Sequence, residues 1–507
     1  MQESIFDMLY HKYKITKPIR LIEFFAGYGS QALALKYLGV PFEHWKICEW
    51  AVKSIQAYKD IHFTDKYYWE SIEDCTIPNE ILVDTLFNVG ISSNYNEPMT
   101  KEQIQRLSYE QLVRIYENIL ITNNLVNIQG TKGKDLEIVD TDKYDYILTY
   151  SFPCQDLSLA GKGKGMSDTS TRSGMLWEVE RILYECKELG TLPQILLMEN
   201  VPQVHGTDNV KDFNKWQLRL EELGYKNYFE DLIATDYGIP QTRNRCFMVS
   251  ILGDYSYTFP KPIPLEKKLK DMLEDNVDEK YYISDKQIKD IQNWNAYEKP
   301  LENMEKIDKS NISPTLTTRT GAYAAGMVLI KNNTKKGYLE AKDGDGVDIS
   351  SRMEYHRGTV QKGKTQTLTT MGGENNGVVV SDILKKDLCN KLIQDGLVEE
   401  GDVVKHSYTQ QILDGNKKCV EKNDGNMITL TTRGDCVGTA VKDNMNNLRI
   451  RKLTPKECFR LMGVKDENFE KCAKNQSNAS LYHLAGDSIV VNVLMAIFNE
   501  LLKKEGE

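Results

Sequence analysis

Two short motifs carry the residue types best suited to chemistry, Ser-Phe-Pro-Cys-Gln at 151–155 and Glu-Asn-Val at 199–201. A thiolate can add to C6 of a pyrimidine ring, and a carboxyl group can hydrogen-bond to N3 or protonate it. These two steps would turn the electron-poor C5 of a cytosine into a nucleophile able to attack a methyl donor. The pairing therefore predicts that Cys154 and Glu199 are catalytic. A lone cysteine is more often a buried, inert side chain, but the flanking proline and glutamine favour the catalytic interpretation.

A pair of arginines stands in the motif Gln-Thr-Arg-Asn-Arg at 241–245, just before an apolar run. Residues two apart on a strand face the same side of a sheet, so Arg243 and Arg245 are predicted to point together. Two guanidinium groups could hold a pyrimidine carbonyl or a phosphate. A pair of surface charges is an equally good interpretation of this pattern taken alone.

A glycine turn, Phe-Ala-Gly-Tyr-Gly at 25–29, follows the apolar run 19–25. Such a turn lets a ligand lie close to backbone, and an acidic residue after the next strand, here Glu49, can bind both ribose hydroxyls of a nucleoside. A plain packing turn is the alternative. The chain has neither the full G-x-G-x-x-G pattern nor a Walker lysine, which favours a nucleoside cofactor without a pyrophosphate, such as S-adenosylmethionine.

Strands that alternate with helices must position these motifs. The pattern predicts strands at 19–25, 44–48, 146–150, 194–198 and 246–251, with helices at 31–38 and 51–58 among those between them. Alternation of this kind implies a parallel, doubly wound sheet, whose ligands bind beyond the carboxyl ends of the strands. The polar, helix-leaning stretch 64–131 is interpreted as an insertion into this α/β domain.

The character of the sequence changes after the proline-rich stretch 259–264, which is a candidate domain boundary. The region beyond repeats Thr-Leu-Thr-Thr at 315–318, 367–370 and 429–432. Each copy precedes glycines and valines and is interpreted as a β-hairpin. Most of these threonines should belong to a repeated sheet element, although some hydroxyls could reach a partner. Further on, Thr454, Pro455 and Glu457 predict a capped helix start, and Asp487 or Ser488 is expected to open the last helix.

Composition bounds the class of protein. The 507 residues carry a formal net charge of −9, which argues weakly against nucleic acid as a binding partner, because phosphate groups favour a basic protein surface. However, residues 311–370 hold nine Lys/Arg against five Asp/Glu, a net of +4. Ten cysteines without a C-x-x-C pair predict reduced, mostly buried thiols and no metal site. We find no apolar run long enough to cross a bilayer and no signal-peptide pattern, which predicts a cytoplasmic protein.

Taken in order, these motifs resemble those of the DNA cytosine-5 methyltransferases, of the type found in bacterial and phage restriction-modification systems. The C-terminal motifs Thr-Pro-Lys-Glu-Cys-Phe-Arg at 454–460 and Gly-Asp-Ser at 486–488 extend the likeness. The resemblance implies an α/β class I S-adenosylmethionine-dependent methyltransferase domain and a smaller β-rich target-recognition domain. The implied catalytic residues are Cys154, Glu199, Arg243 and Arg245. The implied cofactor contacts are Phe25, Gly27, Tyr28, Gly29, Glu49, Trp50, Asp135, Pro153, Leu176 and Asp487.

The resemblance also implies an organisation and partners. A cofactor and catalytic domain would span 1–260, a target-recognition domain 261–447, and 448–507 would return to the first domain. The partner would be double-stranded DNA with its target cytosine flipped out of the helix. The protein would be a monomer, and a cognate restriction endonuclease in the same cell is a partner that the resemblance allows.

Two features depart from the family pattern. Asp487 stands where the family commonly has asparagine, and three Thr-Leu elements stand where it usually has one. Two rival interpretations stay open. A tRNA cytosine-5 methyltransferase shares the scaffold, but it has a compact recognition domain and a Cys-Phe-Thr motif that this chain lacks. A catalytically dead DNA-binding regulator is disfavoured by the intact Cys154, Glu199 and arginine pair.

Overall fold

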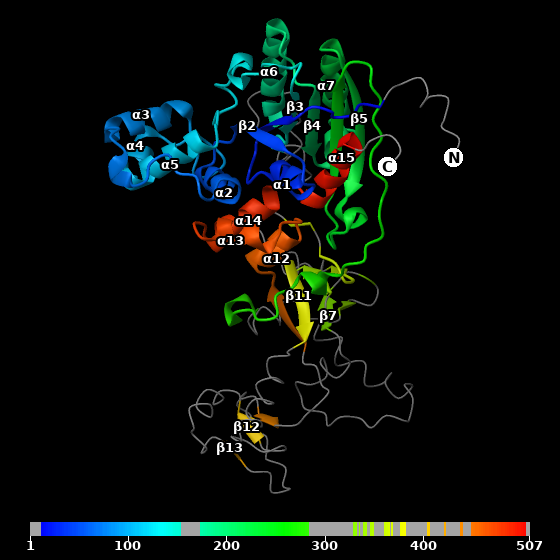
Figure 1. The fold of residues 1–507 in the computed structure, drawn as a ribbon. Coiled ribbons are helices and arrows are strands. Elements are labelled where there is room, and N and C mark those ends of the chain that lie inside the picture. Colours follow the sequence, from blue (N-terminus) through cyan, green and yellow to red (C-terminus); the bar gives the residue numbers. More distant parts are fainter. Residues whose placement is uncertain are drawn as a thin grey trace, which may run out of the picture. The chain divides into compact units, whose positions relative to one another are not determined.

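The computed structural model describes residues 12–153, 173–282 and 448–502, together with short stretches between 328 and 439. The chain divides into two compact units. The first comprises 1–277, 363–376 and 453–507, and the second comprises 278–362 and 377–452. Figure 1 shows the elements of both units coloured along the sequence.

A six-stranded sheet forms the centre of the first unit, in the order β2-β1-β3-β4-β6-β5. Its strands are β1 (Ile19–Phe24), β2 (Phe42–Cys48), β3 (Asp145–Tyr150), β4 (Ile195–Asn200), β5 (Tyr225–Ile233) and β6 (Asn244–Leu252). The five predicted strands are confirmed, and the first four pair in parallel as expected. The sheet is mixed, however, because β6 runs antiparallel to both β4 and β5. The prediction missed β5, since most of this edge strand is partly or fully exposed and lacks an apolar run.

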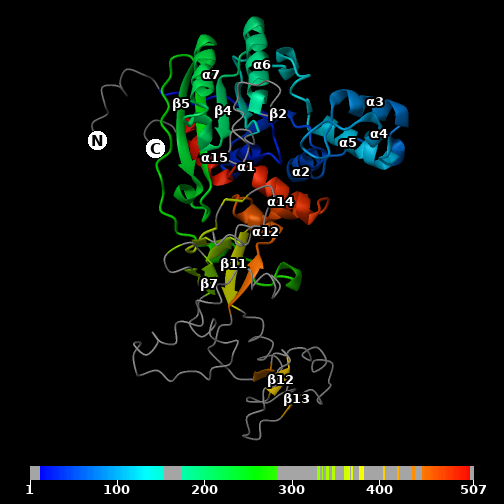
Figure 2. The ribbon, with the colours of Figure 1, turned by 180° about the vertical axis from the view of Figure 1, so that it is seen from behind.

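Helices cover the sheet, and every residue of β1, β3 and β4 is buried. The helices α6 (Leu176–Leu189) and α7 (Val210–Glu222) share one apolar core with β3 and β4. The helix α1 (Ser30–Tyr37) packs against the C-terminal helix α15 (Val491–Leu502). Figure 2 shows the same arrangement from behind. The predicted helices at 31–38 and 51–58 are confirmed, the second as α2 (Val52–His62).

The stretch 64–131 is helical, as predicted, and its hydrophobic core also includes Ile55 of α2. It contains α3 (Asn79–Val89), α4 (Lys101–Gln105) and α5 (Tyr109–Ile121). The segment that leads from α3 returns to the sheet at Ser92, whose backbone N–H donates to Trp50 O at 2.8 Å and whose carbonyl accepts from Val52 N at 2.9 Å. The insertion is thereby anchored directly after β2.

The C-terminal helices begin with the predicted capping box. Thr454 Oγ1 accepts from Glu457 N at 3.2 Å, and Glu457 Oε2 accepts from Thr454 N at 2.8 Å, which starts α12 (Pro455–Arg460). The expected start of the last helix at Asp487 or Ser488 is wrong. Asp487 instead ends α14 (Asn478–Asp487), which follows α13 (Asp466–Ala473), and Ser488 is extended, so α15 begins at Val491.

One stretch, Asn478–Leu502, has the length and mean hydropathy of a membrane span, contrary to the expectation from sequence. Its most apolar window is 72% buried inside the protein. The helix is also interrupted within this stretch, because Ser488 has an extended backbone. These residues therefore pack as core helices of the first unit.

The second unit is built from short strands. They are β7 (Val328–Lys331), β8 (Tyr338–Ala341), β9 (Gly346–Asp348), β10 (Val360–Gln361), β11 (Asn376–Ser381), β12 (Val403–Lys405), β13 (Val420–Glu421), β14 (Val437–Thr439) and β15 (Leu448–Lys452). They form sheets in the orders β10-β9-β11-β15, β13-β12-β14 and β7-β8. Of the three Thr-Leu-Thr-Thr repeats, only Thr367 and Leu368 lie within the described residues, so the hairpin prediction is not tested.

Candidate active site

A cavity of about 370 Å³ lies in the first unit, beyond the carboxyl ends of the four parallel strands. Nine of the residues predicted from sequence line it: Phe25, Gly27, Glu49, Trp50, Pro153, Glu199, Arg243, Arg245 and Asp487. They come from the ends of β1, β2, β3 and β4, from the start of β6 and from the end of α14. The cavity thus combines groups predicted for catalysis with groups predicted for cofactor binding.

The glycine turn has two glycines with different roles. Gly27 adopts a φ of +55°, lines the cavity, and has open space where a side chain would point. Gly29 adopts a φ of +82°, and an added Cβ would collide with Tyr58 and His62. Gly29 is therefore required for packing, whereas Gly27 leaves room for a ligand to approach the backbone.

Glu49 is held in place at the edge of the cavity by backbone donors. Its Oε2 accepts from Gly27 N at 2.9 Å, and its Oε1 accepts from Ala51 N at 2.8 Å. Burial raises the pKa of Glu49 to about 7, and the nearby carboxyl of Asp487 adds to this shift. The aromatic side chains of Phe25 and Trp50 line the cavity beside this carboxyl group.

Glu199 and Arg245 form a buried ion pair. Arg245 Nε lies 3.2 Å from Glu199 Oε1, and the side chain of Glu199 is only 9% exposed. Burial raises the pKa of Glu199, although the charges of Arg245 and Arg243 oppose the rise. A carboxyl group in this environment holds its proton to higher pH than usual and can serve as an acid.

Arg243 is fixed by two carbonyl groups, because its Nη1 donates to Leu368 O at 3.1 Å and its Nη2 donates to Ser488 O at 2.7 Å. It therefore joins β6 to the repeat segment 363–376 and to the C-terminal region, all within the first unit. Both arginines line the same cavity, which favours the site interpretation of the pair over that of a surface charge pair.

Asn200 connects the end of β4 to the segment that follows β3. Its Nδ2 donates to Phe152 O at 3.0 Å, and its Oδ1 accepts from Val201 N at 2.8 Å. The backbone that leads into the predicted nucleophile is thereby tied to the strand that carries Glu199. Cys154 itself lies outside the described residues.

Four of the predicted cofactor residues do not line the cavity. Tyr28 is buried and donates to Ser488 Oγ at 2.8 Å, and Gly29 packs as described. Asp135 accepts from Lys132 N at 2.9 Å in the 3₁₀ turn Gly133–Leu136. Leu176 belongs to the core, and its neighbour Met175 lines the cavity in its place.

The cavity also has lining residues that the sequence did not reveal, Tyr95, Asn127, Ile128, Gln129 and His483 among them. Tyr95 comes from the insertion, for which no motif was recognised. His483 precedes Asp487 by four residues in α14, and its Nδ1 lies 3.2 Å from Asp487 Oδ2. That helical spacing was a signal that could have identified His483.

The chain is similar to known proteins over most of its length. Residues 103–503 match the family model described as C-5 cytosine-specific DNA methylase. The type II methyltransferase M2.ScrFI of Lactococcus lactis subsp. cremoris is 29% identical over 489 residues, which cover 96% of this chain and 100% of that protein. The orphan methyltransferase M.SssI of Spiroplasma monobiae is 37% identical over 270 residues, 52% of this chain and 67% of that protein. The orphan methyltransferase M.SPRI of Bacillus phage SPR is 28% identical over 393 residues, 70% and 82% of the two chains.

Proposed function

The chain belongs to the C-5 cytosine-specific DNA methylase family, and from that premise we propose that the cavity of the first unit is its active site. The reaction is the transfer of a methyl group from S-adenosylmethionine to C5 of cytosine in DNA. One observation supports this assignment of the site more than any other. Glu199 and the two arginines share a single cavity with Glu49, Trp50 and the glycine turn.

The residues around Gly27 fit the cofactor. The open space at Gly27 admits a ligand next to backbone, and the Glu49 carboxyl, fixed by two backbone N–H groups, is placed to accept from ribose hydroxyls. Phe25 and Trp50 offer apolar surfaces for the adenine ring. When bound, the cofactor supplies an electrophilic methyl group on sulfur.

In the proposed mechanism, the thiolate of Cys154 forms a bond to C6 of the flipped-out cytosine. Glu199, whose pKa is raised by burial, donates a proton to N3 in its protonated form, so the ring electrons are directed to C5. C5 then takes the methyl group as the bond from that group to the cofactor sulfur breaks, which leaves a neutral thioether. A base removes the C5 proton, the bond between C6 and the Cys154 sulfur breaks, and the proton on N3 returns to Glu199. Arg245 would orient the Glu199 carboxyl by pairing with it. Arg243 would hold the neighbouring backbone through its hydrogen bonds to Leu368 O and Ser488 O.

The proposal extends to partners. Region 261–447 would recognise the DNA target, since it contains most of the second unit and the basic stretch 311–370. The protein would act in the cytoplasm as a monomer on double-stranded DNA. A cognate restriction endonuclease in the same cell is a further proposed partner, in keeping with the type II methyltransferase among its relatives.

A covalent trap tests the assignment of the nucleophile. Duplex DNA of mixed sequence that contains 5-fluorocytosine cannot lose a proton from C5, so the adduct should persist in the presence of S-adenosylmethionine. The wild-type protein should form a denaturation-resistant complex with this DNA, and Cys154→Ser should form none. A complex that survives in Cys154→Ser, or an equal complex with transfer RNA and none with DNA, would overturn the proposal. A catalytically inactive DNA-binding regulator would bind the DNA but form no covalent complex with it.

A further inference from the structure

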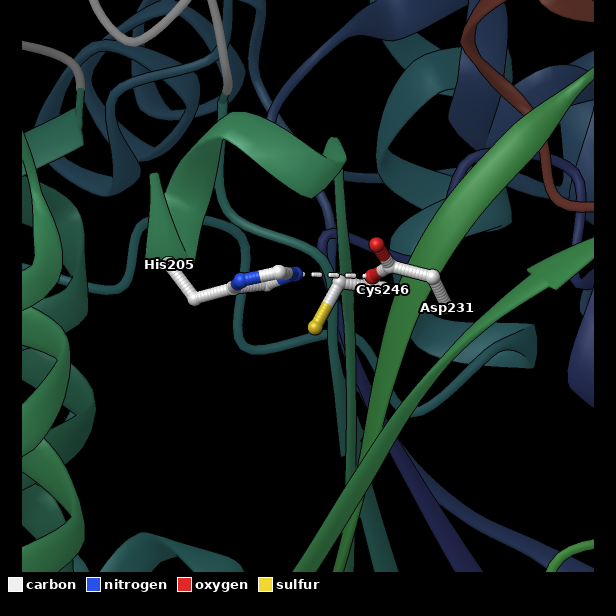
Figure 3. Close-up of side chains that lie close together, drawn as sticks. All are labelled: His205, Asp231 and Cys246. Carbon is white, nitrogen blue, oxygen red and sulfur yellow. Dashed lines mark hydrogen bonds and ion pairs between the residues drawn. The ribbon is translucent and has the colours of Figure 1, made fainter. Parts of the chain in front are cut away.

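Three side chains of the first unit, His205, Asp231 and Cys246, bring metal-binding atoms close together (Figure 3). Asp231 on β5 and Cys246 on β6 are directly paired across the two antiparallel strands. His205 ends the 3₁₀ helix Pro202–His205, which follows β4. The imidazole Nε2 lies 2.9 Å from Asp231 Oδ1, and the three donor atoms all lie within 4.8 Å of one another.

We propose that His205, Asp231 and Cys246 bind a divalent cation of the zinc type. One thiolate, one imidazole and one carboxylate are a donor set that suits Zn²⁺, with a fourth position for water. In a tetrahedral site with bonds of roughly 2.0 to 2.3 Å, the donor atoms lie roughly 3.3 to 3.8 Å apart. The imidazole and carboxylate atoms, 2.9 Å apart, are closer than this range, and the sulfur lies within 4.8 Å of both. Side-chain shifts of roughly 1 Å would bring the three donors to these spacings.

The scaffold around the three donors is rigid. The strands β5 and β6 pair in unbroken register from Tyr225 to Ile233. The imidazole of His205 packs near the rings of Phe213 and Phe229, with centroid distances of 6.1 and 5.6 Å. Sites held by regular strands and packed rings are preorganised for a ligand.

The site is also accessible from one side. The side chains of His205 and Asp231 are 31% and 32% exposed, whereas Cys246 is fully buried beneath them. An ion could therefore enter from solvent and reach the sulfur. Burial and the carboxylates of Asp231 and Glu199 raise the pKa of the Cys246 thiol, so formation of the sulfur–metal bond would release one proton to solvent.

A bound cation would connect segments that also support the active site. Cys246 pairs with Asn200 across β4 and β6, and His205 comes four residues after Val201. The cation would fix the segment after Glu199 to the sheet. This inference does not depend on the proposed roles of the active-site residues.

Cobalt titration of the full chain tests the proposal, because Co²⁺ bound to a thiolate gives a near-ultraviolet charge-transfer band that does not require enzyme activity. We expect the band at one Co²⁺ per chain, and its displacement by one Zn²⁺. Cys246→Ser should abolish the band, and His205→Gln and Asp231→Asn should weaken binding at least tenfold. The last two changes affect half-exposed side chains, so circular dichroism should show them folded.

Two control variants distinguish this site from other thiols. Cys186→Ser removes another buried cysteine, and Cys154→Ala removes the proposed nucleophile. Both should retain the band at wild-type affinity. The proposal is overturned if wild-type protein gives no band, if Cys246→Ser keeps it, or if folded His205→Gln and Asp231→Asn bind as tightly as wild type. The three residues would then be a surface ion pair above an inert thiol.

Discussion

The ring of Tyr95 stacks on the imidazole of His483, with centroids 3.9 Å apart and planes 16° from parallel. The two residues are distant in sequence, since Tyr95 belongs to the insertion and His483 to α14. Both line the cavity together with Asp487, whose Oδ2 lies 3.2 Å from His483 Nδ1. Tyr95 also has a φ of +63°, uncommon for a residue other than glycine. The insertion therefore supplies part of the wall of the proposed cofactor pocket.

Removal of the Tyr95 ring should weaken cofactor binding. A stacked pair of this kind contributes roughly 0.5 to 1.5 kcal/mol, so Tyr95→Ala, which removes this support from the pocket wall, should raise the Kd for S-adenosylmethionine by up to roughly two- to twelvefold. Tyr95→Phe keeps the ring and should bind nearly as wild type, as should Tyr67→Ala, which alters an exposed tyrosine of the same insertion. Isothermal titration calorimetry measures all four proteins. Equal affinity of Tyr95→Ala and wild type would exclude this role.

Loss of the Glu199 proton should slow methyl transfer. A general acid contributes typically 10²- to 10⁴-fold, so Glu199→Gln should lower kcat by about that factor while cofactor affinity stays close to wild type. Glu222→Gln changes an exposed carboxyl on α7 and should leave the rate unchanged. Methyl incorporation into DNA under saturating cofactor is the measurement. A rate within a few-fold of wild type for Glu199→Gln would contradict the assignment.

The raised pKa of Glu199 also sets the direction of a pH effect. The protonated form is the active one, so its contribution is complete below the pKa and disappears as pH rises through it. Because burial has raised that pKa, the activity should persist to higher pH than an ordinary glutamate allows. The alkaline decline of kcat/KM that reports this group should be absent in Glu199→Gln. Identical pH profiles for the two proteins would argue against this role.

Glu23 should make stability depend on pH. This buried residue of β1 accepts from Tyr58 Oη at 2.5 Å and from Ala32 N at 3.3 Å, and burial raises its pKa from 4.5 to about 7. The folded state holds the proton more tightly than the unfolded state does. Its stabilising contribution is therefore complete below pH 4.5 and is lost as pH rises through about 7.

The Glu23→Gln variant removes this titration. Between pH 5 and pH 8 the wild-type free energy of unfolding should fall by up to about 3 kcal/mol more than that of Glu23→Gln. Urea unfolding at both pH values gives the difference. If the free energy of unfolding of both proteins changes by the same amount between the two pH values, ionisation of the buried Glu23 is not the cause of the pH dependence of stability.

The capping box of α12 predicts a specific loss of stability. Glu457 is fully buried and its carboxyl accepts from the backbone N–H groups of Thr454 and Glu274, both at 2.8 Å. Glu457→Ala leaves these donors without acceptors and should lower the free energy of unfolding by about 1 to 3 kcal/mol. Glu467→Ala, an exposed residue of α13, should change it by less than about 0.5 kcal/mol. Similar losses in both variants would show that the capping box is not the cause.

The sequence was most informative where function depends on the ends of parallel strands. Phe25, Glu49, Pro153 and Glu199 each follow or end a strand, and parallel strands bring these ends to one edge. Convergence on one cavity could therefore be predicted without coordinates. Strands buried on both faces tend to be apolar runs, which helped to reveal β1, β3 and β4, whose residues are all buried.

The rest depended on contacts that local patterns do not encode. The mostly exposed β5 has few buried residues to mark it as a strand. Tyr95 reaches the cavity through a stacking partner on α14, which periodicity within the insertion does not reveal. Asp135 was matched by its acidic type, but the coil after α5 brings Asn127 and Gln129 to the cavity instead. Residues in coil are positioned by long-range packing, so their neighbours are hard to infer from sequence.

The most direct test of the account is bisulfite sequencing of unmethylated duplex DNA after incubation with the protein and S-adenosylmethionine. The DNA should contain most short sequence contexts, and Cys154→Ala should be treated alongside. The account predicts cytosines protected from conversion in one short context with wild-type protein, and none with Cys154→Ala. Absence of protection with folded wild-type protein that binds S-adenosylmethionine, or protection that persists in Cys154→Ala, would contradict it.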